Sequence, residues 1–212
     1  MAQGPRKGEE FKVARYTGPK RRLSRREGLP LTGKDIKALE RKGALPPGQH
    51  GAKMRRRISE YGVQLREKQK AKRLYGILEK QFKGYVTAAS KVKGATGLTL
   101  LELLETRLDN VVCRFGFSKS RAEARQLVSH GHIKVDNQKV NIPSYRLRAG
   151  QTIAMSDQMR DNTQVKKSLE ESETLPAWLE RKATIGKVLR MPKREEMEQS
   201  IDEQLIVEFY SR

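Results

Sequence analysis

The spacing of the apolar residues changes at Gly131, and this change limits the possible folds more than any other feature. Before Gly131 there are two segments in which apolar residues recur at helical spacing. Each segment begins with a Ser or Thr followed three residues later by Glu, a capping-box pattern, and ends at a Gly. The starts are Thr99 with Glu102 and Ser120 with Glu123, and the stops are Gly116 and Gly131. We therefore expect two neighbouring helices.

After Gly131 the apolar residues alternate with polar ones, as in a strand that is buried on one face. Ile133 and Val135 precede the turn-forming run 136–138, and Val140 and Ile142 follow it, which predicts a hairpin. A further strand is expected over 152–155, and residues 185–191 can return to the same sheet. The interval 157–174 is polar, and the pattern leaves it either helical or loose.

The first half of the chain has a different character. Residues 1–31 are basic and rich in Gly and Pro, which indicates an extended arm. A short helix is expected over 32–42 and a longer one from Ser59 to about Gly84, with an apolar stripe at Leu74, Leu78 and Phe82. Residues 91–97 read as a linker.

These patterns predict an α+β fold. The expected parts are a basic arm at 1–31, a helical domain at 32–96, and a compact domain at 99–195 in which a helix pair packs on a small, mostly antiparallel sheet. The C-terminal segment 196–212 can pack on the helical domain. Its apolar residues are spaced four apart, which favours a helix, although its β-forming residues leave a strand open.

Charge indicates the kind of partner. The chain has 212 residues and a formal net charge of +20. Residues 1–100 carry 26 Lys or Arg against 8 Asp or Glu, whereas residues 101–212 carry 19 against 17. Such an asymmetric excess is typical of a protein that binds a polyanion. A membrane is not the expected partner, because no run approaches the roughly 20 apolar residues of a spanning helix.

No catalytic constellation is visible in the sequence. The single cysteine, Cys113, lies beside an apolar helical stripe, so we expect a small buried residue rather than a reactive thiolate. His130 and His132 flank Gly131 without the Cys or acidic partners of a metal site, so a helix-capping or phosphate-contacting role is expected for His130. We predict no enzyme activity, no cofactor, no metal and no small-molecule substrate.

The start of the second helix carries the sharpest functional signal. Ser118, Lys119, Ser120 and Arg121 lie at this start, and Arg125 follows one turn later. Helix N-termini present free amides that attract phosphate. Cations there oppose the helix dipole, so stability alone would not favour them. We expect a phosphate site, and the alternative is a solvated basic face.

Other basic segments complete the expected RNA-binding surface. Aromatic residues make up only 6% of the chain, which favours folded RNA recognised by shape and phosphate over single strands stacked on rings. The expected RNA-binding residues are Lys20, Arg21, Arg22, Arg25, Arg26, Lys53, Arg55, Arg56, Arg57, Arg66, Lys70, Arg73, Ser118, Lys119, Ser120, Arg121, Arg125, His130 and Lys134.

Several motifs resemble one family. Residues 105–110, 118–128 and 131–135 resemble a small RNA-binding module that is also found in tyrosyl-tRNA synthetases and pseudouridine synthases. The stretch 60–70 (EYGVQLREKQK), with 47–52 (PGQHGA), 140–145 and 203–212, narrows the resemblance to the bacterial-type family of small-subunit ribosomal protein four. It covers nearly the whole chain and is weakest at 157–174 and in the first ten residues.

The resemblance implies a function. It implies a structural protein of the cytoplasmic ribosome that binds small-subunit rRNA early and organises a multi-helix junction of the five-prime domain. It also implies contacts with small-subunit proteins five and three, an effect on decoding accuracy, and basic residues at 53–57 beside incoming mRNA. Some members repress their own operon. Some carry four N-terminal cysteines that bind zinc, and this chain has none there.

Two other classes of function remain open at this point. An RNA-modifying enzyme can contain the same module, but it needs a separate catalytic domain that the remaining sequence does not provide. A DNA-binding or chaperone-like RNA protein acting off the ribosome is the second alternative. Co-sedimentation with small ribosomal subunits after a high-salt wash would distinguish these classes.

Overall fold

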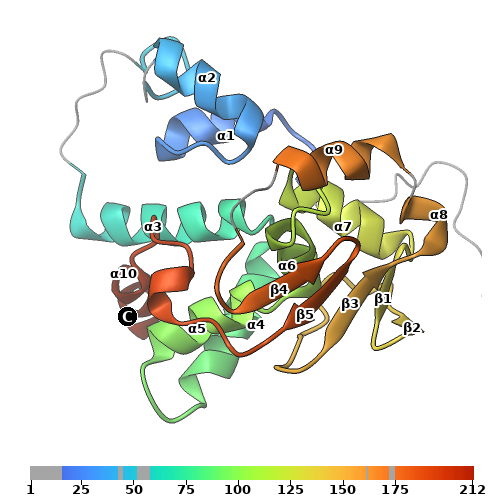
Figure 1. The fold of residues 1–212 in the computed structure, drawn as a ribbon. Coiled ribbons are helices and arrows are strands. Elements are labelled where there is room, and N and C mark those ends of the chain that lie inside the picture. The colour runs from blue at the N-terminus through green and yellow to red at the C-terminus, as the bar shows by residue number, and fades with distance from the viewer. Residues whose placement is uncertain (1–15, 43–44, 52–57, 161, 172–174) are drawn as a thin grey trace, which may run out of the picture.

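The computed structural model describes residues 16–42, 45–51, 58–160, 162–171 and 175–212. Two groups of elements surround two separate apolar cores (Figure 1). In the first, α1 (Lys20–Glu27) and α2 (Gly33–Lys42) lie above α3 (Glu60–Leu74), which is followed by α4 (Glu79–Ser90) and α5 (Thr96–Glu105). The C-terminal helix α10 (Glu203–Ser211) packs on α3 and α5.

The second group contains the helix pair α6 (Leu108–Arg114) and α7 (Arg121–Ser129) and a five-stranded sheet. The strands are β1 (Ile133–Val135), β2 (Gln138–Lys139), β3 (Thr152–Met155), β4 (Leu179–Lys182) and β5 (Ile185–Val188). Their order is β2-β1-β3-β5-β4, and every described pair is antiparallel. The short helices α8 (Asp157–Arg160) and α9 (Thr163–Glu171) and the 3₁₀ turn η1 (Arg194–Glu196) complete the described elements. The expected α+β class is confirmed.

Local signals place the second helix and the hairpin. The Ser120 hydroxyl accepts a hydrogen bond from the Glu123 amide (3.3 Å), so the expected N-cap of α7 is confirmed. Gly131 follows the helix with φ +73°, a left-handed conformation that suits glycine. The turn residues Asp136 and Asn137 both have positive φ (48° and 65°), as a two-residue hairpin requires. Ile142, however, lies outside β2 and is 55% exposed.

The register of the sheet explains the alternation in the sequence. Val135 lies opposite Ile153, and Ile153 lies opposite Gly186, so these residues share the buried face. Together with the helix pair they form the second core, which also contains the fully buried Trp178. The strand expected at 185–191 is therefore confirmed over Ile185–Val188.

The extended arm expected at 1–31 is wrong over Lys20–Glu27, which forms α1. The helix lacks a broad apolar face, so its sequence carries no strong signal. A buried polar contact holds it instead: the Ser24 hydroxyl donates to the carboxylate of Asp35 (2.8 Å), which also accepts from Thr32 (2.8 Å). The part of the arm at 1–15 lies outside the described residues.

The long helix expected from Ser59 to Gly84 is also wrong. Ser59 caps α3 as expected, but the chain turns at Tyr75 and Gly76, and Gly76 has φ +63°. A new helix, α4, then begins at Glu79. As a result Leu74 and Phe82 are buried, whereas Leu78 is 40% exposed. In α2 the side chain of Ile36 is 46% exposed and therefore does not pack in a core.

The first helix of the expected pair is broken in two. Thr99 lies inside α5, where its hydroxyl donates to the carbonyl of Ala95 (3.2 Å), so the expected capping box at Thr99 and Glu102 is wrong. The chain leaves the helical path at Arg107, which has extended backbone angles. The amide of Leu108 donates to the carbonyl of Tyr145 (2.9 Å) and that of Asp109 to Pro143 (3.1 Å). A distant segment thus satisfies the first amides of α6.

The break at Arg107 moves the boundary between the two parts. The buried residues Leu100, Leu101 and Leu104 of α5 belong to the first core, together with α3, α4 and α10. Leu108 and Val112 of α6 belong to the second core. We therefore place the boundary between α5 and α6 rather than between residues 96 and 99.

Candidate nucleic-acid interface

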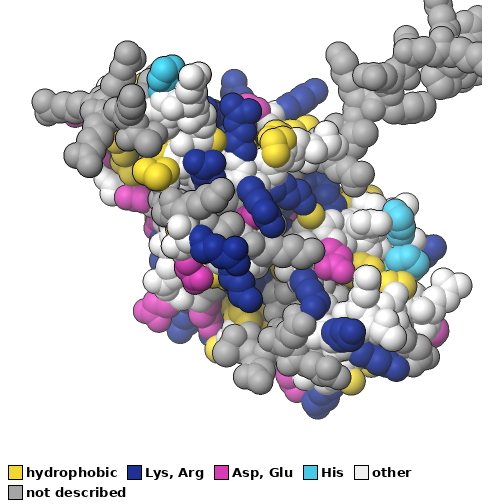
Figure 2. Space-filling view, turned by 90° about the horizontal axis from the view of Figure 1, so that it is seen from above, with side chains coloured by type: hydrophobic (Ala, Val, Ile, Leu, Met, Phe, Trp, Pro, Cys, Tyr) yellow, Lys and Arg dark blue, Asp and Glu magenta, His cyan; other side chains and the backbone are white. Residues whose placement is uncertain are grey.

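Basic side chains form a band across one face of the molecule, seen from the side of α1, α2 and α9 (Figure 2). Five of the expected RNA-binding residues come from α1, and all five are at least partly exposed: Lys20, Arg21, Arg22, Arg25 and Arg26. Arg21 keeps 74% of its side-chain surface accessible, at 3.9 Å from Asp35. Arg25 is half-buried and donates to the carbonyls of Leu45 (3.1 Å) and Pro46 (3.4 Å).

The helix α1 is fixed on α3 by two basic residues of α3. The guanidinium of Arg66 donates to the carbonyl of Arg26 (3.2 Å), and Arg73 forms an ion pair with Glu27. Burial, and then repulsion from Arg26, lower the pKa of Arg73. Lys70 pairs with Glu67 (2.6 Å) in the same helix. Arg66 and Arg73 thus hold the basic helix α1 in place, whereas Lys70 is paired within α3.

The start of α7 differs from the simple picture of free amides facing phosphate. Ser118 is 4% exposed, and its hydroxyl donates to the carbonyl of Ser120 (3.2 Å). The hydroxyl of Ser120 caps the helix, and the carboxylate of Glu123 accepts from the amide of Lys119 (3.0 Å). The Lys119 side chain is exposed. Part of the hydrogen-bonding capacity of this helix end is therefore used within the chain.

The two arginines of α7 contact the helical part of the molecule. Arg121 donates to Asn110 (2.7 Å), and its guanidinium lies 5.0 Å from the ring centroid of Tyr75. Arg125 donates to the carbonyl of Gly76 (2.9 Å). Both arginines reach the turn between α3 and α4, so α7 is fastened to that turn.

The remaining expected residues lie at the C-terminus of α7, in β1, or outside the described residues. His130 is exposed at the C-terminus of α7, with its ring centroid 6.1 Å from that of His132. Lys134 in β1 is partly exposed and lies 3.5 Å from Asp157. The basic segment of Lys53, Arg55, Arg56 and Arg57 lies outside the described residues.

A buried polar cluster lies between the two cores, and the sequence patterns did not predict it. Its centre is the Glu105 carboxylate, which is fully buried and accepts from Tyr75 (2.7 Å), Asn110 (2.6 Å) and Arg114 (2.8 Å). Burial raises the pKa of Glu105, but Arg114, Arg121 and the Tyr75 hydroxyl together outweigh it, and the net pKa is lowered. Glu105 is thus ionised at neutral pH. The sequence feature that could have indicated this cluster is the carboxylate of Glu105 within an otherwise apolar helical segment.

A second buried contact lies at the start of α6. The Arg107 side chain is 1% exposed and makes a two-point contact with Asp109, at 3.0 and 2.6 Å. Its remaining nitrogen donates to the Tyr85 hydroxyl of α4 (2.6 Å). Asp109 compensates the buried charge of Arg107, and the hydrogen bond to Tyr85 links the start of α6 to the helical part.

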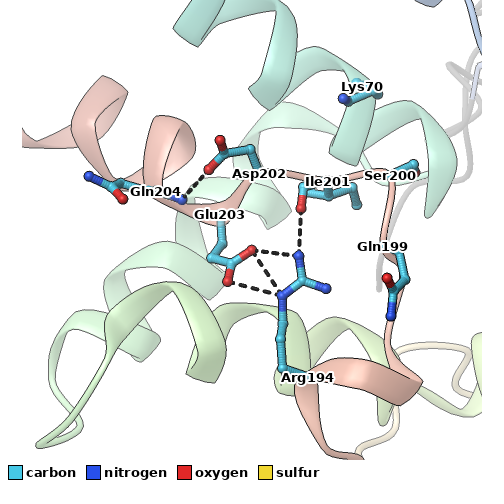
Figure 3. Close-up of a pocket in the computed structure, with 8 residues that line it drawn as sticks. All are labelled: Lys70, Arg194, Gln199, Ser200, Ile201, Asp202, Glu203 and Gln204. Carbon is cyan, nitrogen blue, oxygen red and sulfur yellow. Dashed lines mark hydrogen bonds and ion pairs between the residues drawn. The ribbon is translucent and has the colours of Figure 1, made fainter.

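An open hollow of about 400 Å³ lies between α3 and the segment that precedes α10 (Figure 3). Its charged groups are paired with the protein itself. Arg194 donates to the carboxylate of Glu203 (2.9 Å) and to the carbonyl of Ile201 (2.8 Å). Asp202 caps α10 by accepting from the Gln204 amide (3.0 Å). We assign no ligand to this hollow.

Cys113 is partly exposed, and burial raises the pKa of its thiol, which disfavours the reactive thiolate. Across the described ranges, no group of three or more His, Cys, Asp or Glu side chains could hold a metal ion. Over the same ranges, no helix combines the length and the apolar character that a membrane span requires.

The basic face and the helix pair on its antiparallel sheet define a protein of the RNA-binding class. Two family models match the chain: "S4 domain" at residues 106–153 and "Ribosomal protein S4/S9 N-terminal domain" at 15–105. Their common boundary coincides with the break between α5 and α6. Small ribosomal subunit protein uS4 of Dictyoglomus turgidum is 53% identical over 207 residues, covering 94% of this chain and 100% of the relative. The chain belongs to the uS4 family of small ribosomal subunit proteins.

Other relatives have the same extent. Protein uS4A of Symbiobacterium thermophilum is 53% identical over 208 residues, and uS4 of Opitutus terrae is 51% identical over 204, each covering 94% of this chain and 100% of the relative. The protein is thus a structural, non-enzymatic component of the small subunit that binds rRNA in the cytoplasmic ribosome.

Proposed function

We propose that the chain is a primary rRNA-binding protein that nucleates assembly of the five-prime domain of small-subunit rRNA. The supporting observation is that α1, α3 and α7 are fastened to one another. Arg66 and Arg73 hold α1 on α3, and Arg125 holds α7 on the turn that ends α3. The basic groups of α1 and α3 are therefore held in one preformed arrangement with α7 beside them, which suits a multi-helix junction recognised by its shape and phosphates.

The test is binding to naked RNA. Purified protein is titrated with a five-prime-domain transcript and with a three-prime-domain transcript of equal length, in the absence of other ribosomal proteins. A primary binder prefers the five-prime transcript and protects its junction from chemical probing. Equal affinity for both transcripts would contradict the proposal.

We also propose that Lys53, Arg55, Arg56 and Arg57 line the channel through which mRNA enters, beside small-subunit protein three. A run of cations beside a single strand can hold its phosphates apart from a complementary strand. Replacing all four by Gln should slow translation of an mRNA with a stable hairpin and leave an unstructured mRNA unaffected. Equal slowing of both messages would exclude a role in unwinding.

A contact with small-subunit protein five, with an effect on decoding accuracy, is the last part of the proposal. It is supported by the family resemblance alone. Reconstituted subunits carrying variants of exposed residues that contact protein five should show altered misreading of a near-cognate codon at an unchanged rate of cognate translation. Unaltered misreading across such variants would count against this part.

A further inference from the structure

The turn between α3 and α4 and the start of α7 meet at a polar joint between the two cores. The joint consists of side chains from several segments of the chain: Tyr75, Glu105, Asn110, Arg114, Arg121 and Glu198. Tyr75 belongs to the helical part, Glu105 ends α5, and Asn110 and Arg114 lie in α6. Glu198 lies in the segment that runs back toward α10.

Arg121 connects most of these segments. Its Nε donates to Asn110 (2.7 Å), its Nη2 lies 3.5 Å from the carboxylate of Glu198, and its guanidinium stacks over Tyr75 at 5.0 Å. Only 20% of its side-chain surface is exposed. Three partners in different directions fix the guanidinium plane, as a planar group with several donors allows and a lysine does not.

The groups at the centre of the joint keep fixed ionisation states at neutral pH. Glu105 is ionised, and the pKa of Arg114 is raised because Glu105, Tyr75 and Glu198 together outweigh the effect of burial. Burial, and then Glu105, raise the pKa of Tyr75, so its hydroxyl remains a donor. Buried ion pairs contribute little net stability compared with apolar packing, but they disfavour any arrangement that leaves one charge unpaired. The joint therefore favours one relative orientation of the two parts.

We propose that the joint orients the two RNA-contacting parts, and that Arg121 is a positioning residue rather than a phosphate contact. The inference rests on the proposed function, since it concerns how that binding is achieved. With the joint closed, the basic surface of α1 and α3 and the exposed Lys119 and His130 that flank α7 contact one folded RNA simultaneously. When one part has bound RNA, the other part is already correctly oriented, so its binding costs little conformational freedom. The affinity of the whole protein for the RNA is therefore higher.

Two substitutions separate this role from simple electrostatics because the two explanations predict opposite outcomes. Glu198→Gln removes a negative charge, so electrostatics alone predicts equal or tighter RNA binding, whereas disruption of the joint predicts weaker binding. Arg121→Lys keeps the positive charge, so a phosphate contact would be largely preserved. Lysine cannot stack on Tyr75 while donating to both Asn110 and Glu198, so the joint would loosen.

The experiment measures the affinity of the full-length variants for a five-prime-domain junction transcript and for one hairpin too short to reach both parts. We expect Glu198→Gln and Arg121→Lys each to weaken junction binding about three- to tenfold, with an unchanged salt slope and unchanged hairpin affinity. Hydrogen exchange at residues 75–76 should become faster. The matched controls are Glu195→Gln and Arg148→Lys, which change exposed side chains outside the joint and should bind like wild type.

Each contrary outcome has a distinct meaning. Junction binding by Glu198→Gln that is equal to or tighter than wild type would overturn the inference, and so would wild-type binding by Arg121→Lys. A parallel decrease on junction and hairpin would show that the joint serves folding alone, which also overturns it. If wild-type protein binds junction and hairpin equally well, the proposed function itself fails.

Discussion

The ring of Phe115 occupies the space that a side chain at Gly186 would fill. A Cβ atom built on Gly186 would lie 2.5 Å from Cε1 and Cζ of Phe115. Phe115 follows the last residue of α6 and is fully buried, while Gly186 lies in β5, so this contact sets how closely the helix pair approaches the sheet. The ring is also packed against Phe117, at 5.5 Å between centroids, and has little room to move.

Gly186→Ala should therefore destabilise the compact part. Overpacking a close-packed core typically costs about 1–3 kcal/mol, because side chains or backbone must shift. Urea denaturation followed by the fluorescence of Trp178, which lies in the same core, measures the effect. Wild-type stability of the variant would show that α6 is free to move away from the sheet.

Gly84→Ala should have the opposite effect. Gly84 lies within α4 and is exposed, and a methyl group added there would meet no atom within 4 Å outside its own helix. Alanine in a helix interior is favoured over glycine by about 0.5–1 kcal/mol, because glycine loses more backbone freedom on folding. Thermal denaturation should show a higher midpoint. A lower midpoint would mean that the α4 surface packs against something at this position.

The carboxylate of Glu79 makes the stability of the helical part dependent on pH. Burial raises its pKa, but hydrogen bonds from Lys68, Lys72 and Tyr210 outweigh this and lower the pKa to about 2. The unfolded chain takes up this proton near its ordinary value of 4.5, while the folded chain resists it. This stabilisation is therefore complete above about pH 4.5 and is lost as the pH falls toward about 2.

Comparing wild type with Glu79→Gln by denaturation at several pH values tests this. Wild type should lose more stability than the variant between about pH 5 and pH 2. The difference should be about 1 kcal/mol or less, since Glu79 is nearly half exposed to solvent. Identical acid profiles would show that Lys68 and Lys72 do not hold this carboxylate in solution.

RNA binding should depend steeply on salt. If about six phosphates are neutralised, affinity for the five-prime-domain RNA should fall roughly 10³-fold between about 50 and 200 mM salt. Replacing the exposed Lys20 and Arg22 of α1 by Gln should reduce the slope by about one unit for each phosphate that is no longer neutralised. A nearly flat salt dependence would contradict the electrostatic account of the basic face.

Chelation should not affect folding. The single cysteine is Cys113, so the chain lacks the N-terminal cysteines with which some family members bind zinc. We expect equal thermal midpoints with and without a strong chelator, and no stoichiometric metal in the purified protein by elemental analysis. Stoichiometric zinc, or a lower midpoint with chelator, would reveal a ligand set that the sequence does not suggest.

Much of the compact part could be predicted because its signals are local. The cap at Ser120, the stop at Gly131 and the turn at Asp136 and Asn137 each depend on a few consecutive residues. The basic character of α1 and α3, and hence the kind of partner, also follows from the sequence. The helix α1 itself was missed because its main anchor, the contact between Ser24 and Asp35, joins residues eleven apart.

The sequence by itself determined the α+β class, the start and stop of α7, the hairpin and the polyanionic partner, since periodicity, capping and charge act within a few residues of the chain. Only the tertiary structure decided that the helix through Thr106 breaks, because Tyr145 and Pro143 supply carbonyls to Leu108 and Asp109 from more than thirty residues away. It also decided the contacts of Arg121, whose sequence position is equally compatible with phosphate. Its partners Tyr75 and Glu198 reach it only when both cores have formed, so no local pattern records them.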